Sequence, residues 1–286
     1  MFAKLFKYDF RSIRRTGIPA LIVILIATIV GAIDITALIK FFESSSDSAN
    51  ASAGQILLVI FGFFLFAIVL IALTVSATAV QVMILVDFYK SLITDEGYLT
   101  FTLPVKAKDI IFSKTVNAIL WSFLVTLATL ASFAIILYCV DSSITSYEGS
   151  IIGEMFAIYG EVFNELSGGA GMTGMIIVTV IQAIVYAINS QLLYFLAIFI
   201  ASVITRKNKG ITAIALIIGV NFAYGTLTSI ISTITGAITG VAGATGGNVI
   251  ATMNITTIVL TILIAGLTVG FFFILKHLME NKLNLD

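Results

Sequence analysis

Residues Gln55 to Val86 read QILLVIFGFFLFAIVLIALTVSATAVQVMILV, a run without a charged side chain. A helix needs about 20 apolar residues to cross the hydrocarbon core of a bilayer, so this run is longer than one crossing requires. Backbone groups in lipid must pair internally, which favours a helix. A barrel strand would be only about ten residues long and would alternate polar and apolar residues. The run therefore predicts a membrane-spanning helix.

The rest of the chain has the same character. Hydrophobic residues make up 59% of it, charged residues 10%, and the mean hydropathy is +1.14, far from the norms of soluble domains. We predict one all-α transmembrane domain over residues 1–286, with six spans. The spans are Gly17 to Ile39, Gln55 to Val86, Thr115 to Val140, Gly174 to Ile204, Gly210 to Thr235 and Ile255 to Leu275.

The distribution of basic residues predicts the orientation of these spans. Loops on the cytoplasmic side of a membrane retain Lys and Arg. With a cytoplasmic N-terminus, all 15 Lys and Arg residues except Lys40 fall on that side, while the other side carries mainly Asp and Glu. We therefore expect both termini in the cytoplasm and a multi-pass protein of the cell membrane.

Residues 1–16 have the pattern of an interfacial helix, which we call the elbow. At the helical period, apolar and basic residues separate onto two faces, as in helices that lie along a leaflet. The residues that define the elbow are Phe2, Lys4, Leu5, Phe6, Lys7, Arg11 and Ile13. Asp9 breaks the pattern because it falls among the apolar residues, so we expect it to meet a polar partner or lipid headgroups. A basic N-terminus that only anchors the chain is an equal alternative.

Two external segments also have a distinct pattern. Residues 141–173 contain apolar residues at helical spacing with Glu154, Glu161 and Glu165 between them, which predicts an external amphipathic helix. Residues 235–254 are rich in glycine but lack the charge of a solvated loop. We expect a re-entrant hairpin of broken-helix backbone there, with a flexible glycine linker as the alternative.

The sequence lacks the parts of most catalytic sites. It contains no phosphate-binding G-x-x-x-x-G-K-[ST] motif, one histidine (His277) and one cysteine (Cys139). Basic residues are dispersed beside the spans, so the sequence lacks the clustered basic residues that are typical of nucleic-acid binding. We therefore predict a protein that is not an enzyme and that binds no metal, cofactor or nucleic acid itself.

Charged residues are scarce inside the spans, and Asp34 and Lys40 lie near the end of the first one, where both can reach headgroups or water. Uncharged polar residues form stripes along several spans. Such stripes can line a transport path, but Ser, Thr, Asn and Gln are also enriched where membrane helices pack together. The candidate path or interface residues are Gln81, Gln182, Tyr186, Asn189, Asn221, Tyr224 and Thr228.

The longest cytoplasmic loop spans residues 87–114 and reads DFYKSLITDEGYLTFTLPVKAKDIIFSK. We expect the preceding helix to continue to about Ile93, a turn at Gly97, and a new helix from about Lys106, with Asp109 near its favourable N-terminal dipole. Between them lie exposed aromatic and leucine residues, which are typical of protein-binding surfaces. This loop therefore predicts a cytoplasmic partner.

The order of residues in this loop resembles the integral-membrane permeases of type-2 ABC exporters, whose fold is called type V. The matching segment runs from Glu96 through Gly97 to Pro104 and Val105, with Ser113 and Lys114 at the usual start of the next helix. The elbow, the six spans and the hydrophobic element before span six match the same layout. The Gly-Tyr-Leu-Thr sequence at residues 97–100 resembles that of a family branch found in Gram-positive bacteria.

The resemblance implies a dimer of identical or paralogous permeases in a bacterial plasma membrane, each on a separate ATP-binding subunit. ATP and Mg would bind that subunit, and its closure would push the loop and the elbow. The exported substrate is expected to be a peptide, an antibiotic or a lipid-like molecule. The residues implied in ATPase coupling are Asp95, Glu96, Gly97, Tyr98, Leu99, Phe101, Leu103 and Pro104.

Two other functions remain open from the sequence. A membrane anchor or assembly subunit that does not transport could recruit a partner through the same loop. An ion-coupled secondary carrier would work without an ATPase and would show an inverted repeat between its halves. No convincing repeat is visible in the sequence.

Overall fold

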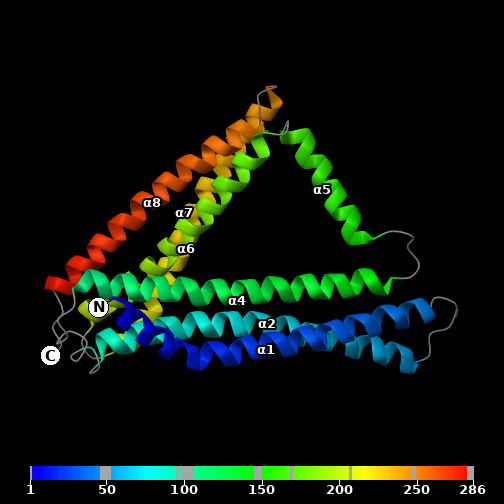
Figure 1. Ribbon diagram of the computed structural model, residues 1–286, viewed down its shortest axis with the longest axis horizontal. Coiled ribbons are helices and arrows are strands. Elements are labelled where there is room, and N and C mark those ends of the chain that lie inside the picture. The colour runs from blue at the N-terminus through cyan, green and yellow to red at the C-terminus, as the bar shows by residue number, and fades with distance from the viewer. Residues whose placement is uncertain are drawn as a thin grey trace. The chain divides into compact units, whose positions relative to one another are not determined.

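The described part of the chain is entirely helical. The computed structural model describes residues 2–45, 53–94, 97, 106–144, 150–167, 170–205, 208–245 and 249–281, and these contain seven helices and no strand (Figure 1). The helices are α1 (Phe2–Ser45), α2 (Ala53–Ile93), α4 (Ala107–Ser143), α5 (Ile151–Ser167), α6 (Ala170–Ile204), α7 (Lys209–Ala244) and α8 (Val249–Asn281).

All six predicted spans coincide with long apolar helices. In the described ranges, six helices are long and apolar enough to cross a membrane, and each contains most or all of one predicted span. Their spanning segments are Lys4–Phe42, Gly54–Ile93, Ala107–Ser143, Ile176–Ile204, Lys209–Val241 and Ile255–Glu280. The predicted all-helical architecture with six helices of spanning length is therefore confirmed in the described residues, whereas the orientation of the termini remains a prediction.

The elbow and the first span belong to one uninterrupted helix. We expected a separate interfacial helix over residues 1–16, but α1 runs from Phe2 to Ser45 and carries Pro19 inside it. Proline lacks a backbone N–H, so the helix loses one internal hydrogen bond there without ending. A surface position for the first turns of α1 remains a prediction.

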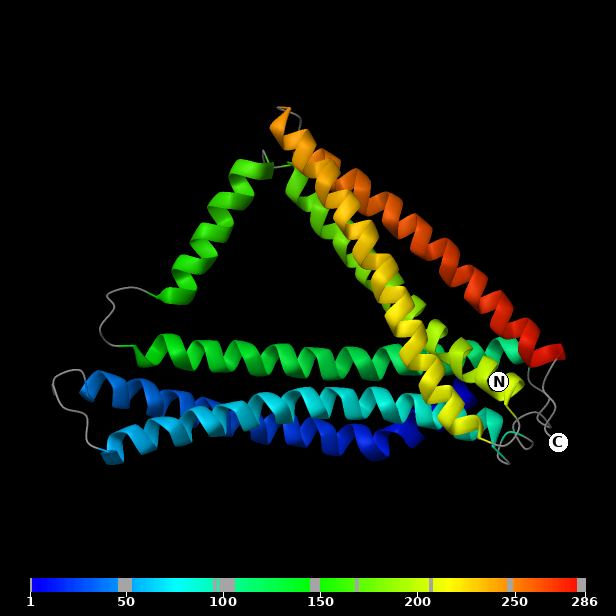
Figure 2. The ribbon, with the colours of Figure 1, turned by 180° about the vertical axis from the view of Figure 1, so that it is seen from behind.

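The chain divides into two compact units. The first unit comprises Met1–Asp9, Leu85–Ile119 and Glu161–Asp286, and the second comprises Phe10–Ile84 and Leu120–Gly160. In the second unit, α1, α2 and α4 run side by side (Figure 2). Close contacts hold them together: Thr28 Oγ1 donates to Ser132 Oγ at 2.6 Å, and Trp121 packs directly against Gly17.

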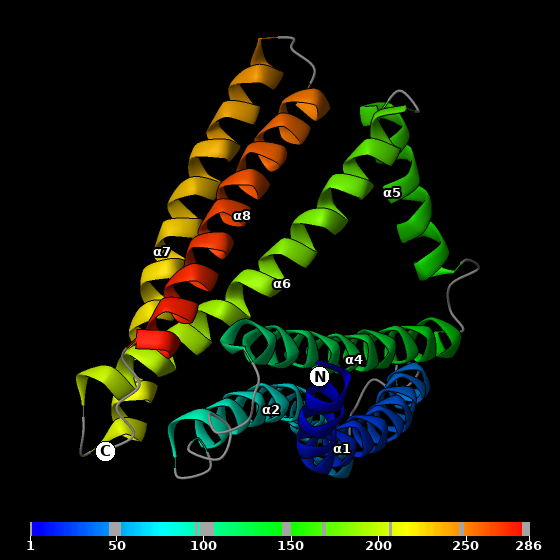
Figure 3. The same ribbon diagram turned by 60° about the vertical axis from the view of Figure 1, so that its left-hand side comes forward.

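In the first unit, α6 packs against both α7 and α8, and α7 also contacts α8 (Figure 3). In the second half of α6, Phe195 and Phe199 are fully buried. In contrast, α7 exposes apolar side chains such as Ile211 and Phe222 along its length. Exposed apolar helices of this kind are compatible with lipid rather than water.

The amphipathic segment at residues 141–173 contains the expected helix, α5. Its first turn is capped by Ser150, whose Oγ accepts from the Gly153 N–H at 2.9 Å and donates to Asp141 Oδ2 at 2.7 Å. A serine cap of this type satisfies backbone donors that have no partner inside the helix. Met155 and Phe156 are exposed on α5.

The glycine-rich stretch at residues 235–254 is more helical than expected. We predicted broken-helix backbone, yet α7 continues through Gly236 and Gly240 to Ala244, and α8 begins at Val249. Glycine costs about 1 kcal/mol relative to alanine in a helix interior. An unpaired backbone group in lipid costs several kcal/mol, so the helix is the better solution. Whether the stretch enters the membrane as a hairpin remains a prediction.

Candidate functional site

The two helices that flank the predicted cytoplasmic loop have the bounds at the loop that the sequence indicated. α2 ends at Ile93 and α4 begins at Ala107, with Asp109 in its first turn. After α2, the Gly97 N–H donates to Thr94 O at 2.7 Å and closes a turn. A Cβ on Gly97 would lie 2.6 Å from Leu92 O, so a side chain does not fit there.

The remaining predicted coupling residues lie outside the described part of the chain. These are Asp95, Glu96, Tyr98, Leu99, Phe101, Leu103 and Pro104. The site can therefore be built from the helical stems of the loop and from the residues that hold these stems in place.

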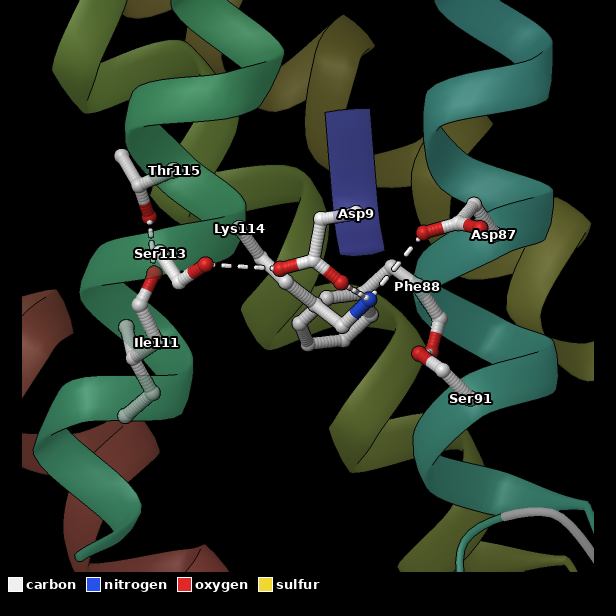
Figure 4. A network of polar contacts seen from close by, with 8 residues as sticks. All are labelled: Asp9, Asp87, Phe88, Ser91, Ile111, Ser113, Lys114 and Thr115. Carbon is white, nitrogen blue, oxygen red and sulfur yellow. Dashed lines mark hydrogen bonds and ion pairs between the residues drawn. The ribbon is translucent and has the colours of Figure 1, made fainter. Parts of the chain in front are cut away.

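A charged cluster joins three helices, α1, α2 and α4, within the first unit (Figure 4). Lys114 Nζ at the start of α4 lies 3.1 Å from Asp9 Oδ1 of α1 and 3.0 Å from Asp87 Oδ2 of α2. Ser113 Oγ donates to Asp9 Oδ2 at 2.7 Å. We call Asp9, Asp87, Ser113 and Lys114 the charged cluster.

The cluster is largely shielded from solvent. The side chain of Lys114 is 6% exposed, and those of Asp9 and Asp87 are 16% and 18% exposed. Two carboxylates share one ammonium, and their mutual repulsion is offset only while Lys114 lies between them. Breaking a buried ion pair is strongly unfavourable, so this arrangement holds the three segments together.

The sequence pattern anticipated part of this cluster. Asp9 interrupts the apolar face of the elbow, and the prediction that it meets a polar partner is confirmed by its contacts with Ser113 and Lys114. The identity of these partners was missed. Asp87 ends an uncharged run of α2, and Lys114 precedes the uncharged run of α4. Each of these three charges lies at the border of an apolar segment, and this shared position is the sequence feature that could have indicated the cluster.

Beside the cluster, aromatic stacking ties the end of α2 to α6. The rings of Phe88 and Phe195 are parallel within 4°, with centroids 4.0 Å apart. Both rings are buried, as are Leu92 on α2 and Ile111 on α4. Stacked and buried rings contribute beyond their area alone. The stems of the loop are therefore packed into the first unit and are not loosely tethered.

The elbow residues separate as their pattern predicts. Lys4, Lys7 and Arg11 are exposed, and Ile13 is buried. Leu5 and Phe6 are half-buried, whereas the side chain of Phe2 lies outside the described part of the chain.

Several polar stripe residues make contacts between neighbouring helices. Tyr194 Oη of α6 donates to Asn221 Oδ1 of α7 at 2.9 Å. The rings of Tyr186 and Tyr224 lie 6.0 Å apart, and Asn189 Nδ2 is 3.5 Å from Tyr224 Oη. These contacts favour the packing interpretation for α6 and α7.

The other stripe residues lie outside this α6–α7 contact. Ser122 Oγ donates to Gln81 Oε1 at 3.3 Å between α4 and α2. Thr228 Oγ1 donates to the Tyr224 carbonyl of its own helix at 3.0 Å, and Gln182 is half-buried on α6. Gln81 and Ser122 belong to the second unit, whereas the stripe residues of α6 and α7 belong to the first.

A shallow hollow of about 510 Å³ lies on the exposed side of α7 and is lined by residues of that helix alone, including Asn221, Phe222 and Gly225. No group of three or more His, Cys, Asp or Glu residues that could hold a metal ion occurs in the described ranges.

The six apolar helices of spanning length in the described part of the chain are typical of a multi-pass helical membrane protein. Comparison with known proteins does not narrow this class: no family model, no curated protein and no solved structure matches the chain.

Proposed function

We propose that the chain is the membrane-spanning permease subunit of an ATP-driven ABC exporter, powered by a separate ATP-binding subunit in the cytoplasm. ATP and Mg would bind that subunit, since this chain has no phosphate-binding motif of its own. A second permease, identical or paralogous, would complete the path for a peptide, antibiotic or lipid-like substrate.

The observation that carries the proposal is the position of Lys114. Its ammonium contacts Asp9 and Asp87 within 3.1 Å, so one side chain links the N-terminal segment to both stems of the cytoplasmic loop. A force applied to the loop would reach these three segments together. A loop that only recruits a partner has no need of such a rigid base.

In the proposed mechanism, closure of the ATP-binding subunits pushes the segment from Glu96 to Pro104. The stems transmit this displacement because Phe88, Leu92 and Ile111 are fully packed. Packed interfaces respond by moving between discrete arrangements and do not deform continuously. The spans would therefore rock between inward-facing and outward-facing states.

The two alternatives differ in what they require. A membrane anchor needs the loop but tolerates loss of the polar stripe residues, such as Asn189 and Asn221. An ion-coupled carrier transports without an ATP-binding subunit. Transport by the purified chain in vesicles without ATP would therefore favour the carrier, and partner binding without any transport would favour the anchor.

Replacing Glu96 with Lys, or Leu99 and Phe101 with Asp, is expected to uncouple ATP hydrolysis from transport. ATP-dependent export should fall by about tenfold or more, in the range of coupling free energies of roughly 1–3 kcal/mol. The measurement is export and ATP hydrolysis by the complex that co-purifies with the tagged chain from its own host. Membrane insertion should be unchanged.

Glu280→Lys is the matched control, because it makes the same charge reversal on an exposed side chain of α8. It should leave export unchanged. Export that survives both loop changes would show that this loop does not couple ATP hydrolysis to transport. A co-purified complex that hydrolyses no ATP would contradict the exporter itself.

A further inference from the structure

Asp34 is an acidic residue inside the α1 span, three residues after Gly31 and four before Leu38. These spacings place the three residues on neighbouring positions of one helix face. The face is the one that α1 turns toward its neighbours in the second unit. A Cβ on Gly31 would lie 2.9 Å from Val69 Cγ1 and 3.3 Å from Ile136 Cδ1.

On both sides of Asp34, α1 is in close contact with one of its neighbouring helices. Toward one end, Leu38 packs closely on Gly62 of α2. A Cβ on Gly62 would lie 2.4 Å from Leu38 Cδ2. Toward the other end, Thr28 and Ser132 share a buried hydrogen bond of 2.6 Å. The carboxyl group therefore lies between two points where α1 is closely packed.

Asp34 as a residue is half-buried, and its Oδ2 is buried and has no hydrogen-bond partner among the described residues. The sequence had suggested that Asp34 could reach headgroups or water, which does not hold for this oxygen. Residues 54–84 of α2 and 120–140 of α4 include no Lys, Arg or His. Lys40 lies six residues farther along α1, about 120° around the helix axis.

The contacts also give the residues level with Asp34. Gly31 meets Val69 and Ile136, and Leu38 meets Gly62, which places Leu65 and Phe66 of α2 beside Asp34. On α4, the contacts of Gly31 with Ile136 and of Thr28 with Ser132 place Cys139 at this level, and Asp141 lies two residues farther on. Neither helix offers a cation at this level. A carboxylate charge would thus be held in an apolar bundle without compensation, which is costly enough that such groups neutralise instead.

We propose that Asp34 is a proton-binding site in the membrane-embedded bundle, with its carboxyl group neutral and its proton exchanging only when α1 separates from α2 and α4. Loss of the proton leaves a carboxylate that needs water or a cation. The packed arrangement around Gly31 and Gly62 supplies neither, so proton release and opening of the bundle would occur together. Asp9 and Asp87 differ from Asp34 because Lys114 supplies their counter-charge.

The test uses the full chain in lipid vesicles near neutral pH and two carbodiimides. One is the hydrophobic dicyclohexylcarbodiimide, and the other is a water-soluble carbodiimide. A protonated carboxyl group adds its O–H across a C=N bond of the reagent, so no atom is lost and the residue gains the reagent's whole mass. Peptide mass spectrometry then locates the modified residue.

The hydrophobic reagent is expected to modify Asp34, and the water-soluble reagent is not. Asp9 and Asp87 are internal controls, and the hydrophobic reagent should leave both unmodified. An Asp34 that the hydrophobic reagent does not modify, or that both reagents modify equally, would overturn the proposal. The assay needs no ATP-binding partner, so it can fail or succeed independently of the proposed exporter.

Asp34→Asn gives a second measurement, because the amide has the shape of the neutral acid. The variant should lose the labelling at this position and keep the melting temperature of the unmodified chain. A fall in melting temperature as large as that caused by removing Lys114 would show that the site holds a carboxylate and would contradict a neutral Asp34.

Discussion

Lys114→Met is expected to destabilise the protein by about 3 kcal/mol, the lower end of the range for breaking a buried ion pair. The change removes the ammonium that Asp9 and Asp87 share, and two like charges then remain in a largely shielded site. The lower end applies because both carboxylates keep some exposure. The measurement is the apparent melting temperature of the purified chain in detergent.

Lys276→Met is the matched control for this change. Lys276 pairs with Glu280 at 3.9 Å on α8, and the two side chains are 35% and 47% exposed. Exposed pairs of this kind contribute between about 0 and 1 kcal/mol, so the melting temperature should barely move. Equal effects of the two substitutions would show that the charged cluster contributes no more than a surface pair.

The charge explanation can be separated from simple loss of packing. Adding Asp9→Asn and Asp87→Asn to Lys114→Met removes the two like charges and should recover much of the lost stability. Replacing a whole buried ionic group by neutral residues is often neutral or stabilising. Stability that stays low in the triple variant would indicate that the lysine stem, and not its charge, is what matters.

Gly17→Leu is expected to have the second large effect, a destabilisation of about 3 kcal/mol from overpacking. A Cβ at this position would lie 2.2 Å from Trp121 Cζ3, well inside contact distance. The Trp121 ring cannot move away freely, because Phe10 stacks on it with centroids 5.2 Å apart. The gain of about 1 kcal/mol from replacing glycine in a helix is smaller than this clash.

Trp121 is the single tryptophan of the chain, so its fluorescence reports directly on this contact. Gly17→Leu should shift the emission and lower the melting temperature. Gly266→Leu on α8 is the control, because no atom outside its own helix lies within 4 Å of a Cβ there. An unchanged emission spectrum in Gly17→Leu would mean that Gly17 and Trp121 are not in contact.

Local features of the chain could be predicted from the sequence. The end of α2 at Ile93, the start of α4 at Ala107 and the existence of α5 follow from where apolar periodicity and charge begin and end. The helicity of residues 236–244 was missed, because glycine content was given more weight than the need to pair backbone groups in lipid. The elbow boundary was missed because the change from an amphipathic to an apolar pattern near Gly17 does not require the helix to end there.

Contacts between distant residues could not be read in this way. Ser113 and Lys114 are 104 and 105 residues away from Asp9 along the chain, and periodicity carries no information on pairing at that separation. The polar stripes show the same limit. Asn221 has one partner on α6 and Tyr224 has another, which only the side-by-side placement of the two helices reveals.

By itself, the sequence determined a membrane protein of six helical spans, because apolar length and the need to satisfy backbone groups in lipid leave few other structures. Only the tertiary structure decided which charges meet and which do not. Lys114 lies between Asp9 and Asp87, whereas Asp34 faces α2 and α4 segments without a cation. The reason is physical: a residue's own helix fixes the direction of its side chain, but its neighbours on other helices determine whether a charge there is compensated.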